Sequence, residues 1–183
     1  LKTEKQGLIQ LHDKFFETYI SEEEVQNAVR QVAQDINLQY FSKDVLLISV
    51  LNGSFMFTSD LMKNLTVRCE VTFVKYKSYE GTESSGTISE VMGLQVPIEN
   101  RDVIVVEDIV DTGNTLEHIY KILEKENPKS IATASLLYKP DAYKGDSKID
   151  FIGKSIPNAF VVGYGLDYNE QGRHLPEIYK LKE

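Results

Sequence analysis

The sequence has little that would tie the chain together covalently or hold a structural metal. Its single cysteine, Cys69, cannot form an internal disulfide, and the alternating apolar segment around it predicts a buried structural thiol. The three histidines fit no metal-binding spacing. No apolar run reaches the roughly 18 residues that a membrane span needs, and residues 1–10 lack the basic and then apolar order of a secretion signal. We therefore expect a cytoplasmic protein with no membrane partner.

Positive charge is also scarce. The chain has 20 Lys and Arg residues against 28 Asp and Glu residues, which gives a formal net charge of −8. Because nucleic-acid binding draws most of its affinity from basic side chains that neutralise phosphates, we expect no nucleic-acid partner. A small phosphorylated ligand is still compatible with this charge, since a helix N-terminus, a metal ion and a few cations can reverse the field locally.

The length of 183 residues and the hydrophobic content of 42% predict a single domain, residues 1–183. Ser21 and Glu24 form a capping-box pattern at the start of a first helix. Strands are predicted at 45–51, 67–76, 103–106, 131–138 and 159–163, and further helices from residue 55 and at about 114–126. This alternation predicts an α/β fold with a mostly parallel, twisted sheet flanked by helices, in which ligands bind beyond the carboxyl ends of the strands.

The most informative segment is VIVVEDIVDTGNTL, residues 103–116, where a buried strand leads into Glu107 and Asp108, a short loop and a helix. The loop consists of Asp111, Thr112, Gly113, Asn114 and Thr115. Its glycine lets the backbone turn closely around a ligand, and the free N–H groups of the helix start favour a phosphate. The adjacent carboxylates repel each other unless a cation or polyol lies between them, so they indicate Mg²⁺ and ribose hydroxyls. The alternative is a solvated turn in which Asp111 or Thr112 caps the helix.

This order of strand, acidic pair, loop and helix resembles the phosphoribosyl pyrophosphate motif of type I phosphoribosyltransferases, and specifically of the hypoxanthine-guanine phosphoribosyltransferases. Four further segments carry the resemblance: LNGS at 51–54, KSY at 77–79, SLLYK at 135–139 and FVVGYGLDYNEQGR at 160–173. They are similar to the pyrophosphate loop, the start of the mobile lid, the base-recognition strand and the purine-binding hood of that family. The implied fold therefore carries a lid at about 77–90 and a small hood, built from both ends of the chain and including about 139–183, over the base site.

The resemblance also implies an activity, its substrates and a cofactor. The activity is purine salvage, in which the 5-phosphoribosyl group passes from phosphoribosyl pyrophosphate to hypoxanthine or guanine, giving IMP or GMP and pyrophosphate. The implied cofactor is Mg²⁺. The implied assembly is a homodimer or homotetramer.

Residue roles on the phosphoribosyl side follow from the same resemblance. Asp111 corresponds to the general base that accepts the purine proton, and residues 111–115 would hold the 5′-phosphate. Glu107 and Asp108 would meet the ribose hydroxyls and a metal ion.

The pyrophosphate side is implied to use mainly backbone groups. Leu51, Asn52 and Gly53, with a cis peptide bond between the first two, would hold pyrophosphate together with the forked guanidinium of Arg173. Many relatives carry Lys where this chain has Asn52. That departure weakens any claim for a side-chain charge at residue 52 but leaves the backbone assignment standing.

The base side is implied to read a 6-oxopurine. Lys139 would donate to the 6-oxo group, Phe160 would stack on the ring, the Val161 backbone would read the ring edge, and Asp167 would carry a second Mg²⁺. Each residue also has an ordinary structural interpretation: Phe160 as core, Lys139 as a solvated lysine and Asp167 as a turn residue.

The polar segment 77–90 carries the last of the implied contacts. Ser78 and Tyr79 would reach the active site when the lid closes, and the alternative is a disordered surface loop.

Two rival function classes use a related fold. A regulatory protein that senses a phosphoribosyl ligand and binds RNA or DNA is disfavoured by the net charge of −8. A flavodoxin-like or response-regulator domain does not explain residues 160–173.

Overall fold

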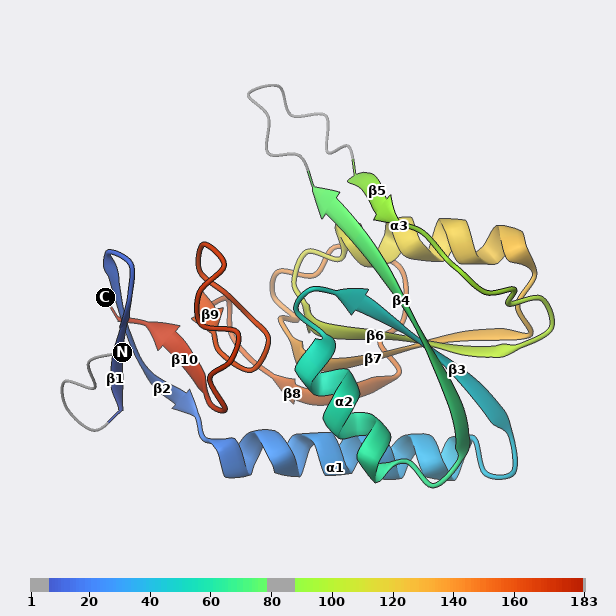
Figure 1. Cartoon of the computed structure of the whole chain (residues 1–183), viewed down its shortest axis with the longest axis horizontal. Helices are drawn as coiled ribbons and strands as arrows, with labels where there is room; N and C mark the ends of the chain where they lie inside the picture. Colours follow the sequence, from blue (N-terminus) through green and yellow to red (C-terminus); the bar gives the residue numbers. More distant parts are fainter. Residues whose placement is uncertain (1–6, 79–87, 183) are drawn as a thin grey trace.

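The computed structural model describes residues 7–78 and 88–182 and contains two sheets (Figure 1). The larger, six-stranded sheet has the order β5-β4-β3-β6-β7-β8. Its strands are β3 (Asp44–Leu51), β4 (Arg68–Ser78), β5 (Ile88–Met92), β6 (Asp102–Val110), β7 (Ser130–Tyr138) and β8 (Phe151–Ser155). All neighbouring pairs are parallel except β4 with β5, which is antiparallel. The predicted α/β class with a mostly parallel sheet is therefore confirmed.

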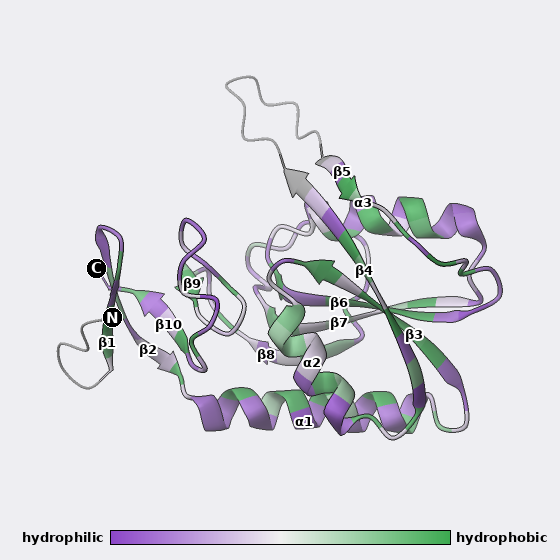
Figure 2. Ribbon diagram, in the orientation of Figure 1, coloured by the Kyte–Doolittle hydropathy of each residue, from purple (hydrophilic) through white to green (hydrophobic). Residues whose placement is uncertain are grey.

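Helices cover both faces of this sheet. Helices α1 (Glu22–Gln39) and α2 (Phe55–Asn64) pack on one face, and α3 (Asn114–Leu123), followed by the short 3₁₀ helix η1 (Glu124–Glu126), packs on the other. Successive strand residues point to opposite faces, so Val45 and Leu47 join the first core while Leu46 and Ile48 join the second. Figure 2 shows the hydrophobic colouring of β3 between the helices. Burial on both faces explains why its sequence is continuously apolar.

Helix α1 begins with the capping box that Ser21 and Glu24 predict. The Ser21 side chain accepts a hydrogen bond from the Glu24 backbone N–H at 3.3 Å, and the Glu24 carboxylate accepts one from the Ser21 N–H at 3.1 Å. This reciprocal pair satisfies two of the free N–H groups at the helix start. The predicted capping box is confirmed.

A second, four-stranded sheet forms the hood, with the order β1-β2-β10-β9. Its strands are β1 (Leu8–Leu11), β2 (Lys14–Ile20), β9 (Val161–Val162) and β10 (Ile178–Leu181), all antiparallel. The hood stands at one end of the main sheet and contains both ends of the described chain (Figure 1). Helix α1 leaves the hood directly after β2 and runs beneath the main sheet.

Four details differ from the sequence predictions. The strand predicted at 159–163 shrinks to β9 and belongs to the hood rather than to the parallel sheet. The hood begins later than residue 139, because β8 pairs in parallel with β7 inside the main sheet. Strands β1, β2, β5, β8 and β10 were not predicted, because each is short and its residue pattern alone does not distinguish a strand from a loop. Cys69 is half-buried, not fully buried as predicted.

No helix among residues 7–78 and 88–182 combines the length and apolar character needed to span a membrane.

Candidate active site

The loop between β6 and α3 forms a small polar hollow at the carboxyl end of the main sheet. A cavity of about 100 Å³ is lined by Glu107, Ile109, Val110, Asp111, Thr112, Gly113, Asn114, Thr115 and Leu116. Gly113 is the N-cap of α3, with φ 88°, and no side chain caps this helix. The alternative in which Asp111 or Thr112 caps the helix is therefore wrong. Because the first N–H groups of a helix have no intrahelical acceptor, this hollow suits a phosphate group.

A segment that sequence reasoning missed folds over the same loop. The ring of Tyr143 lies so close to Gly113 that a Cβ there would overlap it. The Tyr143 hydroxyl donates to the Ser147 carbonyl at 2.5 Å and to the Glu117 carboxylate at 3.4 Å. Burial, and then the Glu117 charge, raise the pKa of Tyr143 to about 12, so the hydroxyl stays a donor. No local pattern signals Tyr143, because its contact with Gly113 crosses the whole of α3 and β7.

The carboxylates of Glu107 and Asp108 lie in an environment that disfavours their charged forms. Glu107 is 7% exposed, and burial together with the Asp108 charge raises its pKa well above the ordinary value. Burial raises the pKa of Asp108 to about 6, against the lowering effect of nearby N–H groups and of Arg173. Neither carboxylate belongs to an ion pair among the described residues. Adjacent carboxylates, one buried and one half-buried, are costly as plain structure when no cation is paired with them.

The predicted pyrophosphate loop lies directly against this pair. The peptide bond between Leu51 and Asn52 is cis, as the resemblance implies. A Cβ on Gly53 would overlap the Asp108 carboxylate, so only glycine fits between loop and carboxylate. The Gly53 carbonyl in turn touches Gly165 of the hood, whose φ of 100° also requires glycine. Loop, acidic pair and hood therefore meet in one place.

Arg173 lies at the same junction and is already engaged. Its Nη1 donates to the Gly165 carbonyl at 2.9 Å, and its Nη2 lies 2.8 Å from Asp167 Oδ1 and 3.1 Å from Glu170 Oε2. Its Nε is buried and has no hydrogen-bond partner among the described residues. The predicted pyrophosphate cation and the predicted second metal ligand, Asp167, are thus paired with each other.

The base side brings together two residues predicted for different steps. Lys139, only 6% exposed, places Nζ 2.7 Å from Asp111 Oδ2 and 3.5 Å from Asn158 Oδ1. The ring of Phe160 is 46% exposed, whereas Val161 is buried. The structural interpretations of Lys139 as a solvated lysine and of Phe160 as core are both wrong, because the exposures are reversed. An exposed aromatic ring can stack on a planar ligand, and a buried ammonium can donate to a polar group.

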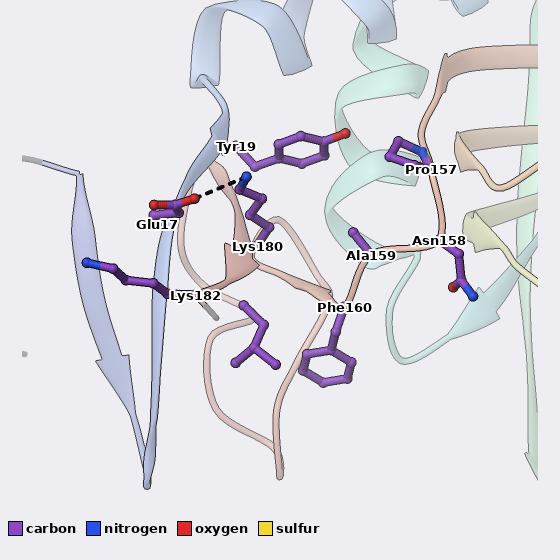
Figure 3. A pocket seen from close by; sticks show the side chains of 9 residues that line it. Glu17, Tyr19, Pro157, Asn158, Ala159, Phe160, Lys180 and Lys182 are labelled. Carbon is purple, nitrogen blue, oxygen red and sulfur yellow. Dashed lines mark ion pairs between the residues drawn. The ribbon is translucent and has the colours of Figure 1, made fainter.

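Aromatic residues of the hood support Phe160 from behind. Phe16 lies 6.1 Å and Tyr168 5.9 Å from it, ring centre to ring centre, and Lys14 Nζ lies 5.7 Å from its ring. Figure 3 shows a second cavity, of about 560 Å³, that Phe160 also lines. An ion pair between Lys180 and Glu17 stands on its wall, at 3.1 Å. Lys139 and Asp111 do not line it, so this cavity adjoins the candidate base site but is separate from it.

The predicted lid is described only at its two ends. Tyr79 lies outside the described residues, as do residues 80–87. Ser78 is the last residue of β4, which pairs with β5 on the other side of the lid segment. Within the described ranges, no group of three or more His, Cys, Asp or Glu side chains is arranged to hold a metal ion.

Comparisons with known proteins agree with this arrangement. Residues 19–169 match the family model described as a phosphoribosyl transferase domain. A hypoxanthine-guanine phosphoribosyltransferase of Staphylococcus aureus is 39% identical over 173 residues, covering 94% of this chain and 97% of that protein. A crystal structure of a hypoxanthine-guanine phosphoribosyltransferase from Bacillus anthracis, with a HEPES molecule in the active site, has a TM-score of 0.86 at 35% identity and covers 91% of this chain and 98% of its own. A hypoxanthine phosphoribosyltransferase from Staphylococcus aureus has a TM-score of 0.86 at 40% identity, with 91% of each chain covered.

Proposed function

The chain belongs to the phosphoribosyltransferase family, and on that premise we propose that it transfers the 5-phosphoribosyl group of phosphoribosyl pyrophosphate to hypoxanthine and guanine. The products would be IMP or GMP and pyrophosphate. One observation carries the proposal: Lys139 pairs at 2.7 Å with Asp111, which lines the phosphate hollow, and lies 3.5 Å from Asn158, two residues before the exposed ring of Phe160. A cation and a base therefore stand where a purine on Phe160 would meet a ribose phosphate in the hollow.

The reaction makes three demands on this chain. A purine nitrogen attacks the anomeric carbon as pyrophosphate leaves, so the nitrogen must lose a proton, the leaving group must be neutralised and water must be excluded. We assign the proton to Asp111, whose side chain is 43% exposed and can reach a bound ligand. The N–H groups of residues 112–115 would hold the 5′-phosphate. Arg173 would exchange its contacts with Asp167 and Glu170 for the leaving pyrophosphate.

The acidic pair fits a magnesium ion held jointly with the substrate. Mg²⁺ takes oxygen ligands and is usually bound through one or two carboxylates plus substrate oxygens, rather than by a cage of protein groups. Glu107 and Asp108 supply such oxygens in a buried place and have no cation of their own among the described residues. When bound, the ion would neutralise charge on the leaving pyrophosphate. Asp167 would contribute to a second ion once Arg173 has released it.

Lys139 explains a preference for 6-oxopurines. Its ammonium has donors and no acceptor, so it can satisfy a 6-oxo oxygen but would face the 6-amino donors of adenine across a buried site. A site built to hydrogen-bond a substrate group rejects an analogue lacking that group by roughly 10⁴–10⁵. The 2-amino group of guanine needs only an acceptor, which backbone carbonyls near Val161 and Asp167 can supply.

The test compares kcat/KM for hypoxanthine, guanine and adenine at saturating Mg²⁺ and phosphoribosyl pyrophosphate. We expect both 6-oxopurines to be substrates and adenine to be nearly inert. Lys139→Ala should lower kcat/KM for hypoxanthine and narrow the gap to adenine, whereas Lys144→Ala, which removes an exposed lysine of the adjacent loop, should do neither. Adenine turnover within about tenfold of hypoxanthine would contradict the hydrogen-bond argument, because that ratio is no more than one methylene group provides.

A further inference from the structure

One lysine that sequence reasoning did not single out reaches the pyrophosphate loop. Lys75, near the end of β4, is the strand neighbour of Leu51 in the parallel pairing of β3 with β4. The pairing of β4 with β5 shifts register between Lys75 and Tyr76, and such a bulge re-aims side chains. The half-buried Lys75 side chain places Nζ 3.0 Å from Asn52 Oδ1. A cation therefore stands beside the loop although residue 52 itself is neutral.

Two other cations assigned to the candidate site, Arg173 and Lys139, are already paired with carboxylates. Arg173 is engaged by Asp167 and Glu170, and Lys139 by Asp111. Lys75 belongs to none of the ion pairs found among the described residues. An ammonium carries three donors, of which Asn52 accepts one.

The partner of the Lys75 ammonium is the neutral side-chain amide of Asn52. An amide oxygen holds the ammonium in place by a hydrogen bond but does not cancel its charge, as a carboxylate would. The Asp108 carboxylate lies directly against Gly53 of the loop, so an anion bound there needs a cation beside it. A leaving pyrophosphate carries several negative charges. Lys75 is placed to offset part of them at the loop.

We propose that Lys75 is a pyrophosphate-binding residue: its ammonium contacts the diphosphate of phosphoribosyl pyrophosphate, and Asn52 holds the side chain in position. The proposal rests on the proposed function, because it assigns a further contact within the same site. It locates on β4 the side-chain charge that the loop sequence itself lacks.

The experiment uses matched variants to separate the charge of Lys75 from its hydrogen bond to Asn52. Lys75→Met removes both the charge and the hydrogen bond, Lys75→Gln keeps a donor for Asn52 but removes the charge, and Lys75→Arg keeps the charge. Lys125→Met removes an exposed lysine of η1 and is the control. For each full-length protein, calorimetry measures binding of magnesium pyrophosphate, and steady-state kinetics measures KM for each substrate.

We expect Lys75→Met and Lys75→Gln to weaken pyrophosphate binding and raise KM for phosphoribosyl pyrophosphate by roughly 10- to 100-fold, the range of a hydrogen bond to a charged group. KM for hypoxanthine should stay within about twofold, and Lys75→Arg should recover most of the affinity. Lys125→Met should behave as the parent protein.

Three results would overturn the proposal. Unchanged pyrophosphate affinity in Lys75→Gln would show that the charge of Lys75 does not contribute to pyrophosphate binding. Equal rises in both KM values with a lowered melting temperature would make Lys75 a structural residue. Failure of Lys75→Arg to bind better than Lys75→Gln would exclude a charge effect. The proposed function would fail differently, through parent protein that binds pyrophosphate but does not convert hypoxanthine.

Discussion

The ammonium of Lys139 lies 2.7 Å from Oδ2 of Asp111. The two residues follow the carboxyl ends of β7 and β6, which run parallel and side by side, so residues 28 positions apart in the chain lie at the same edge of the sheet. Lys139 is buried and Asp111 is half exposed. The pair therefore joins the base side of the site to the phosphate hollow, and four predictions follow from this and neighbouring contacts.

Asp111→Asn should keep the shape of the loop and remove its basicity. We expect kcat to fall by roughly 10²–10⁴ with little change in the affinity for phosphoribosyl pyrophosphate, because a general base acts in the transition state. Asp141→Asn, at an exposed carboxylate of the next loop, is the matched control and should leave kcat unchanged. Near-normal kcat in Asp111→Asn would require another base.

Removing Asp111 and removing Lys139 should lower the free energy of unfolding by different amounts. Asp111→Asn leaves the buried Lys139 charge without its carboxylate and should lower the free energy of unfolding by about 1–3 kcal/mol. Lys139→Met leaves a half-exposed carboxylate that water can solvate, and the methionine stem still fills the buried space, so the loss should be smaller. Urea unfolding of the two variants measures both values. A larger loss of unfolding free energy in Lys139→Met than in Asp111→Asn would show that Asp111 depends on Lys139 more than Lys139 depends on Asp111.

Gly165 should tolerate no side chain. A Cβ there would overlap the Gly53 carbonyl in addition to the strain of a φ of 100°. Gly7, with a φ of 87° and its nearest neighbouring atom 3.5 Å from a Cβ, isolates the strain alone. Gly7→Ala should therefore cost about 1–2 kcal/mol of unfolding free energy. Gly165→Ala should cost more and also raise KM for phosphoribosyl pyrophosphate, because it displaces the pyrophosphate loop. Equal effects in both assays would mean that the hood does not press on this loop.

Tyr164 links the hood to α2 and should make stability depend on pH. Its hydroxyl donates to Asp60 Oδ2 at 2.7 Å. Burial alone would raise the pKa of Asp60, but hydrogen bonds from Lys63, Tyr164 and Gln26 outweigh it and hold that pKa below 3.8. A carboxyl whose pKa is lowered by folding stabilises the fold at pH values above its pKa in the unfolded state. This contribution is lost as the pH falls through its pKa in the folded state.

Tyr164→Phe should therefore lower the free energy of unfolding by about 1.5–3 kcal/mol at neutral pH, and the difference should shrink below about pH 4 as Asp60 takes up its proton. Thermal unfolding across this range measures it. In an Asp60→Asn background the difference between Tyr and Phe should no longer vary with pH. A constant difference in the native background would show that Asp60 does not carry the effect.

The sequence by itself determined the local elements of this protein. The continuous apolar runs of β3 and β6, the capping box at Ser21 and the strand, acidic pair, loop and helix around Glu107 depend on neighbours within a few residues, so they could be predicted. They identified the phosphate hollow and the parallel sheet. The hood as a unit could not be predicted, because β1 and β2 pair locally but β10 joins them only when the two ends of the chain meet.

Only the tertiary structure decided which charges meet. The contacts of Lys139 with Asp111 and of Lys75 with Asn52 depend on strand order, register and a bulge, none of which leaves a local pattern. The packing of Tyr143 on Gly113 and of Gly165 on Gly53 has the same origin. The physical reason is that side-chain chemistry is a property of single residues, whereas the distance between two distant residues is a property of the whole packed chain.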